Sequence, residues 1–71
     1  MRTIKTYYYR TWHKDRCGCS VCTNWDWIDA ASKAEIMRRK NKTRSQIDIL
    51  TEDEMKAYHE RHPGYRVYWK N

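Results

Sequence analysis

Residues 45–64, SQIDILTEDEMKAYHERHPG, contain the most direct structural signals in this 71-residue chain. Residues 47–50 predict a short strand after a linker. The next four residues, Thr51-Glu52-Asp53-Glu54, have the S/T-x-x-E pattern of a capping box, with three acids in the first turn of a helix. We expect this helix from about residue 52 to residue 61 or 62, where Pro63-Gly64 ends it.

The residues that follow predict a further strand. Residues 65–70, YRVYWK, alternate, with Tyr65, Val67 and Trp69 on one side and the other three side chains on the opposite side. This is the pattern of a half-buried strand. In the helix before it, residues spaced i, i+3, i+4 and i+7 predict an inward-facing stripe. The stripe consists of Met55, Tyr58, His59 and His62.

The N-terminal region also predicts a strand. Residues 3–13, TIKTYYYRTWH, are rich in Thr, Tyr and Ile and contain no Gly or Pro. Alternation places Tyr8 and Arg10 on one face and Tyr7 and Tyr9 on the other. Neither face is purely apolar, so the pattern leaves open which of them is buried.

A helix is expected from residues 23–24 to about residue 39. Thr23 or Asn24 can cap its N-terminus. An apolar stripe with the 3.6-residue period supports it, formed by Trp27, Ala30, Ala31, Ala34 and Met37. The expected order is therefore strand, cysteine turn, helix, strand, helix, strand. This order predicts a single α+β domain, residues 1–71, with two helices packed on a two- or three-stranded sheet.

The length of the chain limits its core. A chain this small buries only about 60 % of the surface that it exposes when unfolded. We therefore expect an additional stabilising element, such as a metal, disulfides or a partner subunit. No segment approaches the roughly 20 apolar residues of a membrane span, and the N-terminus, MRTIKTYYYR, lacks the apolar region of a signal peptide. A cytoplasmic location with no membrane partner is expected.

Three cysteines lie within six residues, as C-x-C-x₂-C at Cys17, Cys19 and Cys22. An odd number rules out complete pairing in disulfides within the chain. Thiolates this close repel one another unless a cation lies between them, and Zn²⁺ binds Cys sulfur and His nitrogen in a tetrahedron. Gly18 allows the tight turn that brings the thiolates together. The segment resembles the ligand turns of zinc knuckles and treble-clef modules, over about ten residues and as a general class only.

A tetrahedral site needs a fourth ligand. His13 lies four residues before Cys17 and completes a compact Cys₃His set. His59 and His62 are alternatives that the fold would have to bring to the site, and Asp15 is a weaker one. Four protein ligands make a closed, structural zinc site. We therefore expect a zinc-stabilised domain that unfolds when the metal is removed.

The charge is unevenly distributed. The chain carries a net charge of +6, of which residues 1–44 contribute +7 and residues 45–71 contribute −1. The densest stretch, MRRKNKTR at residues 37–44, contains five basic residues. Such runs often contact phosphates, although cations also stabilise the C-terminal end of a helix. The predicted nucleic-acid-binding residues are Arg10, Arg38, Arg39, Lys40, Lys42 and Arg44.

Two functions fit these features. The first is a small basic, zinc-stabilised regulatory protein that binds RNA or DNA, with phosphate contacts from the basic run and base stacking on the tyrosines beside Arg10. The alternative is a protein-binding adaptor or inhibitor, of the size that bacteria or phages encode, which docks on RNA polymerase, the ribosome or a nuclease. Exposed Tyr, Trp and Arg would then be its hot spots. We expect no enzyme, because the chain has no G-x-S-x-G motif and only two glycines.

Overall fold

The computed structural model describes residues 3–11 and 24–70. These residues form three strands and two helices in the order β1-β2-α1-β3-α2. The elements are β1 (Lys5–Thr11), β2 (Asp26–Ala30), α1 (Lys33–Lys40), β3 (Ile47–Thr51) and α2 (Glu52–Arg61). The expected α+β class is confirmed, with two helices and a three-stranded antiparallel sheet.

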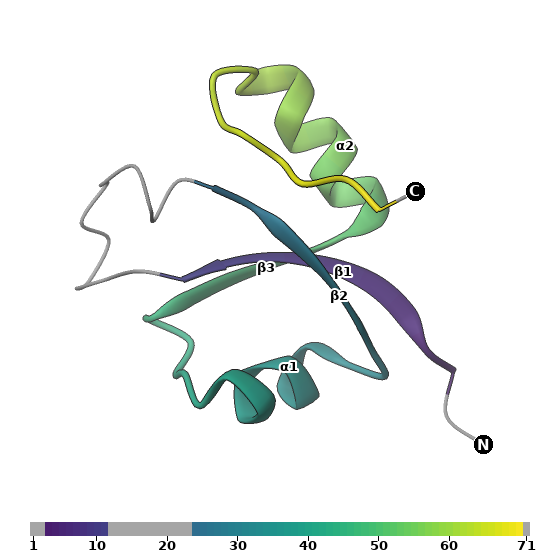
Figure 1. The fold of residues 1–71 in the computed structure, drawn as a ribbon, viewed down its shortest axis with the longest axis vertical. Coiled ribbons are helices and arrows are strands. Elements are labelled where there is room, and N and C mark those ends of the chain that lie inside the picture. Colours follow the sequence, from purple (N-terminus) through teal and green to yellow (C-terminus); the bar gives the residue numbers. More distant parts are fainter. Residues whose placement is uncertain (1–2, 12–23, 71) are drawn as a thin grey trace.

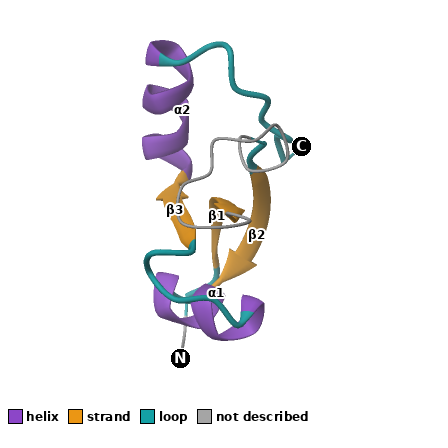
Figure 2. Ribbon diagram, turned by 90° about the vertical axis from the view of Figure 1, so that its left-hand side faces the viewer, coloured by secondary structure: helices purple, strands orange, loops and turns teal. Residues whose placement is uncertain are grey.

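The central strand of the sheet is β1. The strand order is β2-β1-β3, and Tyr8 at the middle of β1 faces Trp27 of β2 on one side and Leu50 of β3 on the other. Helix α1 lies on one side of the sheet and α2 on the other (Figure 1). Figure 2 shows the same arrangement from the side, with the three strands between the two helices. Because successive strand residues point to opposite faces, β1 serves both layers.

Each face of the sheet has its own apolar core. The α1-side core contains Tyr7, Ile28, Ala30, Ile36 and Ile47, all buried. The α2-side core contains Tyr8, Trp25 and Met55, of which none is more than 1 % exposed. Both faces of β1 are therefore buried, which answers the question that its mixed pattern leaves open.

The helix expected over residues 23–39 is wrong in its first half. Residues Asp26–Ala30 form the strand β2 instead. Its buried residues Ile28 and Ala30 are two positions apart, which is the spacing of a strand and not of a helix. Helix α1 begins only after Ser32, whose Oγ accepts a hydrogen bond from the backbone N–H of Glu35 at 3.2 Å.

The second helix agrees with its sequence signals. Helix α2 runs from Glu52 to Arg61, and the capping box at its start is complete. The backbone N–H of Glu54 donates to Thr51 Oγ1 at 3.2 Å, and the backbone N–H of Thr51 donates to Glu54 Oε1 at 2.8 Å. Of the expected stripe, Met55 is fully buried, Tyr58 and His59 are half-buried, and His62 is exposed.

The strand expected at residues 65–70 is not formed. This segment makes a single parallel bridge, Val67 with Trp25, in which the N–H of Trp25 donates to Arg66 O at 2.9 Å. Tyr65 and Val67 do pack against the α2-side core, as the alternation predicts. After the bridge, the ring of Trp69 packs edge-on against Tyr8 at 5.4 Å between ring centroids. In the described part of the chain, neither helix is long and apolar enough to cross a membrane.

Candidate nucleic-acid interface

The predicted basic run lies at the C-terminal end of α1 and in the loop that leads to β3. We call this set the basic surface, and it consists of Arg38, Arg39, Lys40, Lys42 and Arg44. The first three belong to the last turn of the helix. Arg38, Arg39 and Arg44 are exposed, whereas Lys40 and Lys42 are half-buried.

The chain reverses at Asn41, which has the left-handed conformation φ 55°, ψ 48°. Its N–H donates to Arg38 O at 3.2 Å, and the N–H of Lys42 donates to Met37 O at 3.0 Å. This is the closure of a helix by a residue of positive φ, for which Asn is the usual choice after Gly. The reversal keeps Lys42 beside the last turn of the helix, which carries the first three cations.

Two of these cations have structural contacts. Arg39 Nη1 donates to the backbone carbonyl of Asp29 at 2.8 Å, which ties α1 to the end of β2. Lys40 Nζ lies 4.7 Å from the ring centroid of Tyr9, within the range of a cation–π contact. Among the described residues, ion pairs join Arg10 to Asp48, Lys33 to Glu54 and Lys70 to Asp29, so that none involves the basic surface.

The helix dipole explains only part of this surface. Cations stabilise the C-terminal end of a helix, but the effect fades beyond the last turn. Arg38, Arg39 and Lys40 satisfy that role. Lys42 and Arg44 lie after the cap, where the dipole gives no comparable reason for a positive charge.

Arg10 lies apart from the basic surface. It is 8 % exposed, and its Nε donates to Asp48 Oδ2 at 3.3 Å. Its guanidinium carbon lies 4.9 Å from the ring centroid of Trp25 and 5.1 Å from that of Tyr65. These contacts join β1, β3 and the C-terminal segment, so we leave Arg10 out of the proposed interface.

The tyrosines of β1 do not form an open stacking surface. Tyr7 is 8 % exposed and Tyr8 is 1 % exposed, because the helices cover both faces of the strand. Tyr9 is half-buried beneath Lys40. Their expected role in base stacking is therefore wrong for Tyr7 and Tyr8, whose rings belong to the two cores.

Exposed aromatic side chains of the described residues lie elsewhere, on β2 and in the segment after α2, and we refer to them together as the aromatic patch. Trp27 is 39 % exposed, Tyr68 48 % and Trp69 40 %. Lys70 Nζ lies 5.1 Å from the ring centroid of Trp27 and donates to both carboxylate oxygens of Asp29 at 2.9 Å. The sequence pattern placed Trp27 on an inward helical stripe, so its exposure was missed. Alternation in a strand would have separated it from Ile28.

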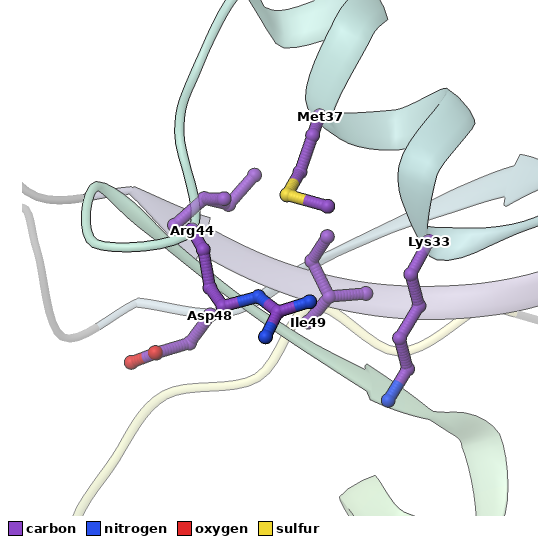
Figure 3. Close-up of a pocket in the computed structure, with 6 residues that line it drawn as sticks. Lys33, Met37, Arg44, Asp48 and Ile49 are labelled. Carbon is purple, nitrogen blue, oxygen red and sulfur yellow. The ribbon is translucent and has the colours of Figure 1, made fainter.

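A surface hollow of about 340 Å³ lies between α1 and β3. Its lining contains Lys33 and Met37 from α1, Arg44 from the loop, and Ile47, Asp48 and Ile49 from β3. Figure 3 shows the side chains of Arg44 and Lys33 on different sides of Met37 and Ile49. The carboxylate of Asp48 points away from these four side chains. The sequence predicts the charge of Arg44. It does not predict the hollow, because the hollow forms where α1 and β3 pack together.

The predicted zinc ligands His13, Cys17, Cys19 and Cys22, and the weaker candidate Asp15, lie outside the described residues. Residues 3–11 and 24–70 contain no group of three or more His, Cys, Asp or Glu side chains that could hold a metal.

The two alternative histidines pack against aromatic rings. His59 meets Trp69 edge-on at 5.4 Å between ring centroids, and His62 lies 4.6 Å from Tyr58. The ring of Tyr58 in turn packs against that of Trp25, at 5.3 Å between ring centroids. Trp25 lies three residues after Cys22 in the sequence. Burial raises the pKa of Tyr58 above its ordinary value.

Comparison of the chain with known protein families, with curated proteins and with solved structures gives no match.

Proposed function

We propose that this chain is a small nucleic-acid-binding regulatory protein that contacts phosphates through the basic surface. Five cations gathered at one helix end give a local positive field, and each phosphate that they neutralise releases condensed counterions. The observation that carries the proposal is the position of Lys42 and Arg44. They extend the positive charge past the helix cap, and the described residues offer them no carboxylate partner.

The salt dependence of binding tests this proposal. We would measure fluorescence anisotropy of labelled RNA, single-stranded DNA and duplex DNA with the full chain over a salt series. The triple variant Arg38→Gln, Lys40→Gln, Lys42→Gln is expected to weaken binding to all sequences. The slope of log affinity against log salt should become shallower by about 0.7 to 0.9 for each lost phosphate contact.

A matched control removes the same charge elsewhere. Lys56, Arg61 and Arg66 are exposed on α2 and the segment after it, away from the basic surface. The triple Gln variant of these residues lowers the net charge by the same amount and should leave the salt slope close to that of the wild type. Equal slopes for the two triple variants would show that net charge, and not the basic surface, is responsible for binding.

We further propose that a structural Zn²⁺ stabilises the domain through Cys17, Cys19, Cys22 and one histidine. Support comes from the C-x-C-x₂-C spacing and from the small core available to so short a chain. His13 is the preferred fourth ligand on spacing, with His59 and His62 as alternatives. A strong chelator should abolish the circular dichroism of the folded chain, and an unchanged spectrum after confirmed metal removal would contradict the proposal.

A second candidate function rests on the aromatic patch. Trp27, Tyr68 and Trp69 are large and exposed. Trp and Tyr are enriched among the hot spots of protein interfaces. A protein-binding adaptor or inhibitor that docks on a nucleic-acid-handling complex would use this patch. In that case Trp69→Ala would abolish docking on the complex, while the triple variant of the basic surface would mainly slow association.

A further inference from the structure

The hollow beside Arg44 combines an apolar floor with a cationic rim. Met37 and Ile49 are half-buried and Ile47 is 3 % exposed, so aliphatic groups form its lower part. Arg44 and Lys33 are the cations at its edge, and both are exposed. Among the described residues, Lys33 is held by one long ion pair, with its Nζ 3.5 Å from Glu54 Oε1 at the surface. Such a pair contributes little and leaves this cation able to exchange partners.

The charge at the rim selects the chemistry of the occupant. A purely apolar ligand would make no use of the charges of Arg44 and Lys33, and a simple anion would leave the aliphatic floor exposed to water. A ligand with a flat, uncharged body and a phosphate attached to it satisfies both parts. A nucleotide unit of a polynucleotide has this composition.

We propose that the hollow holds one unpaired base of a single-stranded nucleic acid, stacked on the guanidinium of Arg44. This inference rests on the proposed function and names the form of nucleic acid that the site prefers. Arg44 is the one residue that belongs both to the basic surface and to the lining of the hollow. Bases that are released from a duplex stack on Arg guanidinium planes as well as on aromatic rings.

The same geometry disfavours a duplex. In a duplex the faces of the bases are stacked inside the helix, so a hollow between α1 and β3 can meet the backbone and the base edges in the grooves but cannot take in a base. The basic surface would still attract the phosphates of a duplex. The preference for a single strand therefore comes from the base in the hollow and not from the number of phosphates.

The test compares three labelled probes by fluorescence anisotropy with the full chain. They are an oligodeoxythymidylate, an abasic oligonucleotide of the same length and charge, and the duplex of the first probe with oligodeoxyadenylate. We expect the single strand to bind at least about fivefold more tightly than the abasic probe, the lower end of what one stacked base contributes. Equal affinity for these two probes would overturn the inference.

Variants separate the base contact from the phosphate contacts. Arg44→Lys keeps the positive charge and removes the planar guanidinium, so it should reduce the ratio of the two affinities toward one and leave the salt slope unchanged. The matched control is Arg38→Gln, which removes a cation of the basic surface that does not line the hollow. It should weaken binding to the single-stranded and abasic probes by the same factor.

Each remaining outcome decides between the two proposals. If Arg44→Lys keeps the wild-type ratio of the affinities for the single-stranded and abasic probes, the base is held elsewhere. That result would overturn this inference and leave the proposed phosphate contacts standing. Duplex binding as tight as single-strand binding would do the same. If no probe shows salt-dependent binding, the proposed function is overturned, and this inference with it.

Discussion

Asp29 illustrates how a single side chain connects distant parts of the chain. Its carboxylate accepts hydrogen bonds from Lys70 Nζ at 2.9 Å and from Thr6 Oγ1 at 2.8 Å. It therefore ties β1 and β2 to the C-terminal segment. The hydrogen bond from Lys70, followed by that from Thr6, holds the pKa of Asp29 below its ordinary value. A carboxylate with a lowered pKa in the folded state is a stabilising one, because protonation costs the folded state more than the unfolded state.

The direction of this shift predicts a pH dependence. Asp29 contributes stability above its unfolded pKa of about 3.8, and this contribution is lost as the pH falls through the lower folded pKa. Asp29→Asn should therefore be less stable than the wild type near pH 7 and should lose less stability on acidification. Urea denaturation of both proteins at neutral pH and near pH 3 measures the difference. A constant gap between the two proteins at both pH values would contradict the prediction.

The residues of the candidate site differ in how far the sequence could predict their surroundings. The five cations of the basic surface follow one another in the chain, so their local charge was evident without a structure. The burial of Arg10 depends on Asp48, which lies 38 positions away and which no local pattern pairs with it. The hollow depends on the packing of α1 against β3, and this is again a property of two distant segments.

At the scale of elements, the local signals predicted the whole of α2 but only the second half of the first expected helix. The T-x-x-E pattern at Thr51 marks the start of α2 to the residue. An equivalent S-x-x-E pattern, Ser32 with Glu35, marks the start of α1, and it competes in the sequence with an apolar stripe that begins at Trp27. The stripe misleads because residues 26–30 pair with β1, from Lys5 opposite Ala30 to Tyr9 opposite Asp26. Pairing across more than a dozen positions overrides helical period and propensity.

The caps give a prediction at this scale. Thr51→Ala removes the acceptor for the N–H of Glu54 and should lower the free energy of unfolding by about 1 kcal/mol. Thr51→Ser keeps the acceptor and should restore most of that stability. Thermal or urea denaturation of the three proteins checks both expectations. Equal stability of the Ala and Ser variants would mean that the hydrogen bond of the cap makes no net contribution.

For the whole molecule, β1 is the element that the two cores share. Tyr7 belongs to the α1-side core and Tyr8, the next residue, to the α2-side core. Helix α1 supplies Ile36 to the first core and α2 supplies Met55 to the second, and both side chains are fully buried. Neither core is large, and both include residues of β1. Loss of one core would therefore free β1 on that face and weaken the other core. We therefore expect the described part of the chain to unfold in one cooperative transition.

A mild change in one core tests this coupling through the other. Ile36→Val removes one methyl group and should destabilise the protein by about 0.5–1.5 kcal/mol. Native-state hydrogen exchange then compares the amides of α1 with those of α2, which lies on the opposite face of the sheet. If the cores unfold together, the most protected amides of both helices lose the same free energy of opening. If the amides of α2 keep their wild-type protection, the α2-side core unfolds as a separate unit, and the basic surface can lose its structure while the aromatic patch remains folded.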